Sequence, residues 1–128
     1  MRQSLVVVAA EMLNELNERE LGRYVQRVDG RWPLERVIVG GARILDLQGA
    51  RSQRERGQEF VVILISEYFA GVPWLERVYQ AANLWDAAEM HGAADVHCYT
   101  PGEFARKRDS LPIVRSVSDY GVDLIPQN

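Results

Sequence analysis

Cysteine, lysine and long apolar runs are the features that this chain has little of. Cys98 is the only cysteine, so no disulfide can form within the chain. The sequence shows neither a charged and then apolar leader nor an apolar run of membrane length, so we expect neither secretion nor a membrane partner. These absences favour a cytoplasmic location, where thiols stay reduced.

Basic residues are also fewer than acidic residues. The chain has 15 Lys+Arg residues against 18 Asp+Glu residues, a net charge of -3 and a pI near 5.4. This balance provides no overall attraction for polyanions, so we expect no nucleic-acid partner. Lys107 is the only lysine among the basic residues, which we interpret as a composition bias of the source genome.

What the chain does have is enough apolar sequence for one folded domain over residues 1–128. It has 128 residues, 47% of them hydrophobic and 26% charged, which is typical of a globular protein. The order of its patterns is helix, strand, helix or loop, strand, helix, strand and two helices. This order predicts an α/β (α+β) fold, with a small mixed sheet and flanking helices.

An N-terminal helical region is predicted over residues 1–32. From Ser4 onward, apolar residues recur at steps of three and four, as on one side of an amphipathic helix. The same spacing resumes at Leu21, next to Gly22, which can interrupt a helix. We therefore expect one broken helix or two short ones, ended by turn residues at Asp29 and Gly30.

Three apolar segments are predicted to be strands, and a fourth to be an edge strand. Residues 36–39 are largely β-branched and lead into a Gly-Gly pair, as a strand followed by a tight turn does. Residues 60–65 contain no polar residue, which indicates a central strand covered on both faces. Residues 95–99 give the third strand and residues 122–125 the edge strand. Residues 42–58 are predicted to be mainly an arginine-rich loop.

Helices are predicted between and after these strands. One is expected from Pro73 to near Gly92, with Trp74 or Trp85 turned into the core. Residues 100–103 have the sequence Thr-Pro-Gly-Glu, a capping box that predicts a helix beginning at its proline. A last helix is expected just before the edge strand.

Three places in this order carry a family resemblance. They are the strand that runs into Gly40 and Gly41, the strand headed by Glu59, and the strand that opens with Asp95 and continues into the capping box. Over residues 35–125 the chain resembles the minimal nucleotidyltransferases of the DNA polymerase beta-like superfamily. Members of that family have a strand ending in Gly-Ser, a strand opening with Asp-x-Asp, and a third strand with a single Asp.

The resemblance implies which residues would form the site. Gly40 matches the family glycine, and Gly41 replaces the serine that contacts a nucleotide phosphate. Together with Arg43 they are the implied nucleotide-binding residues. Glu59 matches the second aspartate of the pair and Asp95 the third carboxylate, so these two are the implied catalytic and metal-binding residues.

The family reaction depends on a metal site that this sequence has only in part. The reaction moves a nucleoside monophosphate from a nucleoside triphosphate to a hydroxyl, and two Mg²⁺ ions about 3.5 to 4 Å apart stabilise the oxygens involved. Gly57 occupies the place of the first aspartate and has no side-chain oxygen to give to a hard cation. The resemblance therefore implies a degenerate member, with Mg²⁺ and ATP or another nucleoside triphosphate as cofactors only if it is active.

Three functions follow from the resemblance. The one we favour is a nucleotidyltransferase-like domain that associates with a small helical protein, as an antitoxin does, or binds nucleotide without transfer. The second is an active metal-dependent transferase acting on a protein or nucleic-acid hydroxyl, with Asp46 or Glu55 completing the metal site. The third is a module in which the Gly40 and Gly41 amides and the loop arginines hold phosphates. A homodimer is the default oligomer.

His97 and Cys98 stand next to the implied carboxylate. His97 is two residues after Asp95 and so shares its face of the sheet. An imidazole there can carry a proton or bind a metal, but the interpretation we favour is a histidine hydrogen-bonded at a strand edge. Cys98 points to the other face and is expected to be a small buried apolar residue.

Overall fold

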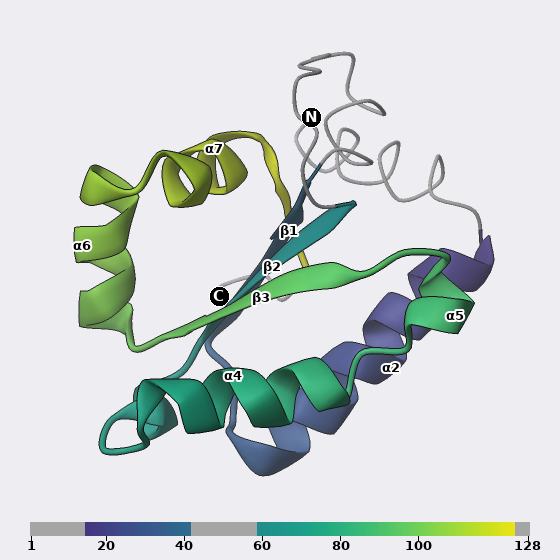
Figure 1. Ribbon diagram of the computed structural model, residues 1–128, viewed down its shortest axis with the longest axis horizontal. Helices are drawn as coiled ribbons and strands as arrows, with labels where there is room; N and C mark the ends of the chain where they lie inside the picture. Colours follow the sequence, from purple (N-terminus) through teal and green to yellow (C-terminus); the bar gives the residue numbers. More distant parts are fainter. Residues whose placement is uncertain (1–14, 42–58, 125–128) are drawn as a thin grey trace.

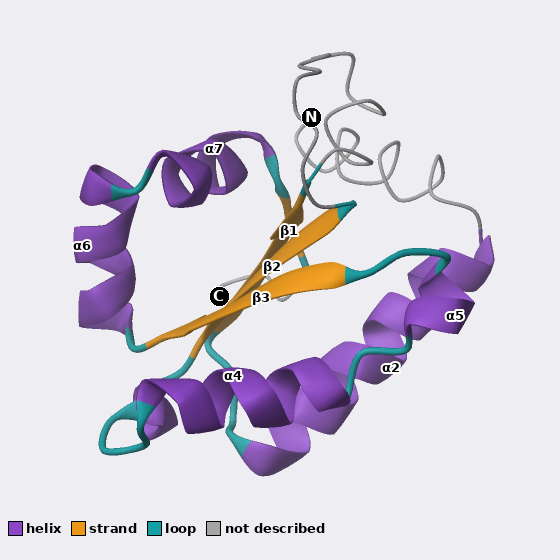
Figure 2. Ribbon diagram, in the orientation of Figure 1, coloured by secondary structure: helices purple, strands orange, loops and turns teal. Residues whose placement is uncertain are grey.

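The computed structural model describes residues 15–41 and 59–124, whose helices and strands are shown in Figures 1 and 2. No described helix is long and apolar enough to cross a membrane. The strands are β1 (Arg36–Gly40), β2 (Phe60–Ile65), β3 (Ala94–Tyr99) and β4 (Val122–Asp123). The helices are α2 (Glu15–Arg31), the 3-10 helix η2 (Glu67–Phe69), α4 (Trp74–Asn83), α5 (Ala87–Met90), α6 (Pro101–Ser110) and α7 (Pro112–Tyr120).

The strands form one mixed sheet in the order β3-β2-β1-β4. β1 runs antiparallel to β2 and to β4, whereas β2 and β3 are parallel. The connection between the two parallel strands contains η2, α4 and α5, since parallel neighbours need a crossover. The predicted small mixed sheet with flanking helices is confirmed, and the expected edge strand is β4.

Helices cover both faces of the sheet: α2, α4 and α5 lie on one face, and α6 and α7 on the other (Figure 1). β2 lies between β1 and β3, and all of its residues are buried. Side chains alternate between the faces of a strand. The even-numbered residues of β2 therefore join the core under α2 and α4, and the odd-numbered residues join the core under α6 and α7. The predicted central strand is confirmed.

The helix α2 differs from the prediction, because it continues through Gly22 without a break. Leu21, Tyr24 and Val28 are buried in the core on one side of the helix, whereas Gly22 is exposed. Burial of that apolar side outweighs the weak helix propensity of a single exposed glycine, which costs about 1 kcal/mol. The first part of the predicted helical region, residues 1–14, lies outside the described residues.

The single helix predicted between β2 and β3 is wrong, since the structure divides it into α4 and α5. The Asp86 side chain accepts a hydrogen bond from the Glu89 amide (3.0 Å) and so caps a new helix. Pro73 is the N-cap of α4 rather than its first helical residue. Trp85 packs against the core, whereas Trp74 is 43% exposed.

The capping box predicted before α6 is present. The Thr100 hydroxyl accepts from the Glu103 amide (3.2 Å), and the Glu103 carboxylate accepts from the Thr100 amide (2.9 Å). These two bonds satisfy orphan amides and start the helix at Pro101. Lys107 and Arg108 lie exposed in its last turn, where positive charge complements the helix dipole.

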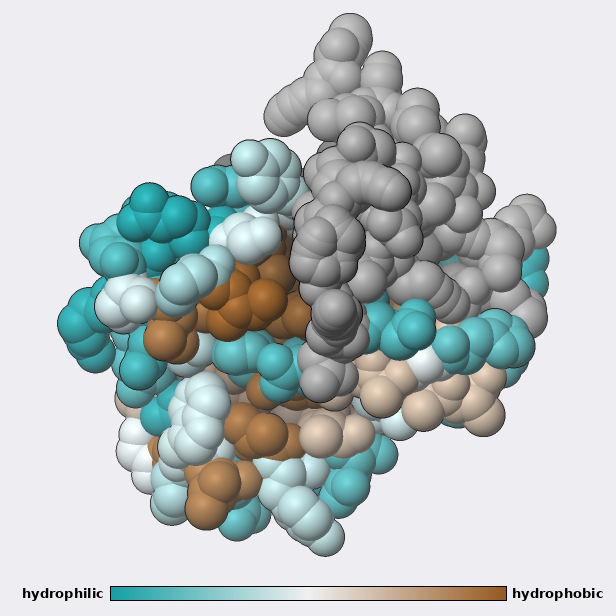
Figure 3. Space-filling view, turned by 45° about the horizontal axis from the view of Figure 1, so that its top comes forward, coloured by the Kyte–Doolittle hydropathy of each residue, from teal (hydrophilic) through white to brown (hydrophobic). Residues whose placement is uncertain are grey.

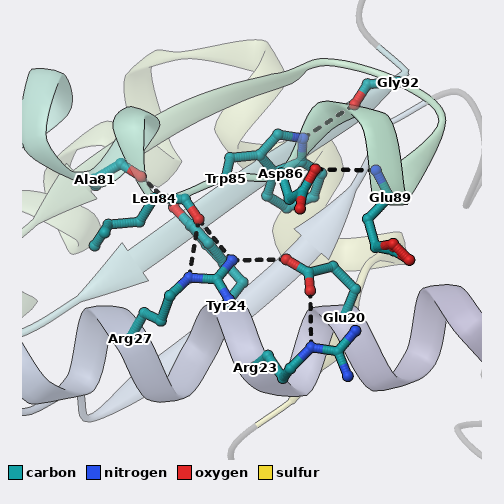
Figure 4. A network of polar contacts seen from close by, with 10 residues as sticks. All are labelled: Glu20, Arg23, Tyr24, Arg27, Ala81, Leu84, Trp85, Asp86, Glu89 and Gly92. Atoms are coloured by element: carbon teal, nitrogen blue, oxygen red, sulfur yellow. Dashed lines mark hydrogen bonds and ion pairs between the residues drawn. The ribbon is translucent and has the colours of Figure 1, made fainter.

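A polar network fixes α2 to α4 (Figure 4). Arg27 donates to the Leu84 carbonyl from Nε (3.1 Å) and Nη2 (2.6 Å), which satisfies an acceptor at the end of α4. Glu20 is 2% exposed and accepts from Arg27 (2.6 Å) and Arg23 (3.0 Å). The Tyr24 hydroxyl donates to a carbonyl of α4 (3.0 Å). The buried carboxylate of Glu20 is therefore paired with two arginines of its own helix.

Candidate functional site

Predicted site residues meet at the end of the sheet where β1 stops and β2 and β3 start. Because β1 is antiparallel to β2, Gly40 at the end of β1 pairs with Val61 near the start of β2. Because β2 is parallel to β3, the same Val61 lies beside Asp95. Val61 therefore separates Gly40 from Asp95, with neighbouring strands about 4.8 Å apart.

Gly41 follows β1 directly and touches the chain that enters β2. Its φ is +109°, a conformation in which a residue with a side chain is strained. A Cβ at Gly41 would lie 2.5 Å from the Glu59 carbonyl oxygen and 2.8 Å from the Phe60 Cα. The position that carries serine in the family thus has no room for a side chain here.

Glu59 lies just before β2 and packs along the turn that precedes β3. A Cβ at Gly92 would be 3.1 Å from both Cβ and Cγ of Glu59, so the glycine leaves the space that this side chain occupies. Gly92 is three residues before Asp95. Glu59 and Asp95 therefore share one end of the sheet. The Glu59 side chain packs on the turn, whereas the Asp95 side chain is hydrogen-bonded to His97 of β3.

Asp95, His97 and Tyr99 form a hydrogen-bonded row on one face of β3. His97 Nε2 is 3.1 Å from Asp95 Oδ2, and His97 Nδ1 is 2.9 Å from the Tyr99 hydroxyl. Tyr99 is buried, the His97 side chain is 14% exposed and the Asp95 side chain is 44% exposed. The Trp74 ring stacks on Tyr99, with 5.5 Å between ring centroids. The row thus runs from the core to solvent.

The buried phenol of Tyr99 determines how donors and acceptors are assigned along this row. Burial raises the pKa of Tyr99 to about 12, with nearby Asp95 adding to the effect, so the phenol keeps its proton at neutral pH. With the Tyr99 hydroxyl assigned as the donor to Nδ1 of His97, Nε2–H of the ring is the donor to Asp95 Oδ2. Both ring nitrogens of His97 are therefore in hydrogen bonds. The favoured interpretation of His97 as a hydrogen-bonded edge-strand residue is confirmed.

The described side chains beside Asp95 offer few oxygens to a cation. Val61 is the residue beside Asp95 on β2, is 3% exposed, and has no oxygen to give to a hard cation. One oxygen of Asp95 already accepts from His97. Within residues 15–41 and 59–124, no three His, Cys, Asp or Glu side chains are grouped so that they could hold a metal ion.

The structure places one further residue singled out in the sequence, Cys98, and leaves others undescribed. Cys98 is buried on the opposite face of β3, and burial raises the pKa of its thiol to about 12, so it is an inert apolar residue as expected. Several candidates lie outside the described residues: Arg43, Asp46, Arg51, Arg54, Glu55 and Gly57.

Two residues of the site were missed by sequence reasoning. Tyr99 is the second partner of His97, and its signal was present, because Asp95, His97 and Tyr99 stand at steps of two on one strand. Trp74 covers Tyr99 from α4. Nothing in the sequence pairs these two rings, since the contact depends on where the crossover helix begins.

Replacing Tyr99 by phenylalanine is expected to lower the free energy of unfolding by about 1 kcal/mol, because His97 loses its donor while the ring stays in the core. Urea unfolding followed by circular dichroism measures the change. Tyr120→Phe is the matched control, since Tyr120 is 54% exposed, and we expect a change below about 0.5 kcal/mol. Equal effects in the two variants would argue against a stabilising row.

Comparison with solved structures identifies a similar fold. The chain is similar to the crystal structure, at 1.40 Å resolution, of "a putative nucleotidyltransferase from Sulfolobus solfataricus". The match has a TM-score of 0.50 and 15% sequence identity, and it covers 79% of this chain and 78% of that chain. At that identity the likeness concerns the fold alone, so the chain has a nucleotidyltransferase-like fold. No protein-family model and no curated protein matches the sequence.

Proposed function

We propose that this chain is a nucleotidyltransferase-like domain with a degraded metal site, and that it acts by association with a protein rather than by nucleotidyl transfer. One observation carries the proposal. The position beside Asp95 on the neighbouring strand is held by Val61, a buried apolar residue, and Asp95 itself accepts a hydrogen bond from His97. The position beside Asp95 therefore offers no carboxylate that could bridge two cations.

The distribution of charge supports the loss of transfer. From Glu59 to Ala105 the chain has seven acidic residues, and Arg77 is the only Lys or Arg. Arg77 is 6% exposed and donates to Glu103 at 2.7 Å, so it is not available to a phosphate. A triphosphate that approached Glu59, just before β2, and Asp95 of β3 would meet like charge.

Exposed apolar side chains support association. Tyr68, Leu75 and Tyr79 are 63%, 77% and 69% exposed on η2 and α4. Figure 3 shows apolar side chains on one face of the molecule in two areas, separated by a band of hydrophilic side chains. Exposed apolar surface of this kind marks interaction sites. The family resemblance implies a small helical protein as the partner.

A nucleotidyl-transfer assay on the full chain tests the proposal. We expect no transfer of labelled nucleotide from any of the four ribonucleoside triphosphates to the chain, to added protein or to RNA, with Mg²⁺ or Mn²⁺ present. Wild type and Asp95→Ala should give the same background. Metal-dependent transfer that disappears in Asp95→Ala would replace the proposal by the active enzyme, and ATP binding without Mg²⁺ would replace it by the nucleotide-binding module.

A further inference from the structure

Two exposed surfaces of opposite charge lie on helices that cover opposite faces of the sheet (Figure 1). We call them the aromatic surface, on η2 and α4, and the basic corner, at the end of α6 and the start of α7. The aromatic surface consists of Tyr68, Trp74, Leu75 and Tyr79 with Glu67 and Glu76; the basic corner consists of Arg106, Lys107, Arg108, Leu111, Ile113 and Arg115.

The aromatic surface combines apolar side chains with negative charge. Leu75 and Tyr79 are four residues apart on α4 and therefore share one side of the helix. Glu76 stands between them in sequence and is exposed. The only basic residue of α4 is Arg77, which is 6% exposed and so belongs to the inner side of the helix. α4 thus adds no exposed positive charge to this surface, and the guanidinium of Arg31, which comes from α2, donates to Gln80 at its border.

The basic corner combines apolar side chains with positive charge. Leu111 and Ile113 are 36% and 43% exposed where α6 gives way to α7. Four of the ten residues from Arg106 to Arg115 are basic, and Asp109 is the only acid among them. This corner is therefore an apolar contact with a positive rim, the complement of the aromatic surface.

We propose that the chain associates with a second copy of itself head to tail, with the aromatic surface of one protomer against the basic corner of its partner. Two copies that met through the aromatic surface alone would bring Glu67 and Glu76 of both chains together, and two basic corners would repel in the same way. Opposite charges favour the head-to-tail contact over the symmetric dimer. The inference takes a second copy of the chain, rather than the small helical protein that the resemblance implies, as the occupant of the aromatic surface, and it holds whether or not the domain transfers nucleotides.

The contact is weak and sensitive to salt. Each surface exposes only a few large side chains, and stable interfaces bury at least about 1,000 Å² in total. Because a head-to-tail contact leaves one surface free at each end, association continues with concentration into rings or chains. The charged rims are exposed, so added salt weakens the attraction between protomers.

Sedimentation velocity over a concentration series tests this inference with the full chain. Wild type is expected to show a sedimentation coefficient that rises with concentration at low salt and falls back at high salt. Tyr79→Lys removes the aromatic surface and Ile113→Glu removes the basic corner, and each variant alone is expected to stay monomeric. Tyr120→Lys is the control, since Tyr120 is 54% exposed outside both surfaces, and should associate as wild type does.

A mixture of the two variants separates the head-to-tail contact from a symmetric one. Tyr79→Lys still has the basic corner and Ile113→Glu still has the aromatic surface, so an equimolar mixture is expected to form a dimer that grows no further. Circular dichroism confirms that each variant is folded. Any of three outcomes would overturn the inference. Wild type could stay monomeric at every concentration, either variant could still associate alone, or the mixture could sediment no faster than the separate variants.

Discussion

Replacing Gly41 by serine, the residue that the family carries there, is expected to lower the free energy of unfolding by about 3 kcal/mol or more. A positive φ costs a residue with a side chain about 1 to 3 kcal/mol. The new Cβ would also lie within 2.9 Å of three backbone atoms of residues 59–61, which have to move to admit it. Urea unfolding at neutral pH measures the loss.

Two other glycines separate the cost of the backbone conformation from the cost of the clash. Gly71 has a φ of +85° and open space around it, so Gly71→Ser is expected to lose about 1 kcal/mol. Gly22 lies in α2, where an added Cβ would meet no atom within 4 Å, so Gly22→Ser is expected to be neutral or slightly stabilising. If Gly41→Ser proved no worse than Gly71→Ser, the close approach to β2 would be refuted.

The strands and the capping box could be predicted from the sequence because local patterns determine them. The apolar run of β2 requires burial on both faces, and Thr100 and Glu103 stand at the spacing that two reciprocal hydrogen bonds need. The same local logic would have found the break between α4 and α5. Asp86 and Glu89 repeat an acid-x-x-Glu start of a helix, a signal that was present and was overlooked.

The neighbours of Asp95 could not be predicted, because they depend on strand register. The sequence places Glu59 before β2 and Asp95 on β3, but only the pairing of the strands shows that Val61, not Glu59, lies directly beside Asp95. A shift of two residues in that pairing would exchange an apolar neighbour for a carboxylate. Register is set by packing on both faces of β2, which no local pattern records.

Replacing Arg77 by methionine is expected to lower the free energy of unfolding by about 2 to 4 kcal/mol at neutral pH. The guanidinium is almost fully buried and donates to the carbonyls of Val72 (2.9 Å) and Cys98 (3.1 Å) and to the carboxylate of Glu103 (2.7 Å). Methionine fills the space but leaves these acceptors without a donor, which costs more than the pair itself contributes. The guanidinium also lies over the Phe69 ring, 5.6 Å from its centroid.

The cost of this substitution is expected to shrink in acid. The Arg77 hydrogen bond is the main cause that lowers the pKa of Glu103 below its usual 4.5. A lowered pKa stabilises the folded state above the unfolded value, and that stabilisation is lost as the pH falls through the folded value. Urea unfolding at pH 7 and pH 3 should therefore show a smaller difference between wild type and Arg77→Met at the lower pH.

The exposed pair of Arg36 and Asp123 provides the matched control for this effect. It also joins an arginine to an acid on another element, at 3.1 Å, but its side chains are 30% and 43% exposed. Arg36→Met is therefore expected to change the free energy of unfolding by less than about 1 kcal/mol. If Arg36→Met and Arg77→Met lowered the free energy of unfolding equally, burial of the guanidinium would add nothing to stability. An Arg77→Met cost that stayed constant between pH 7 and pH 3 would instead assign the loss to the two carbonyls rather than to Glu103.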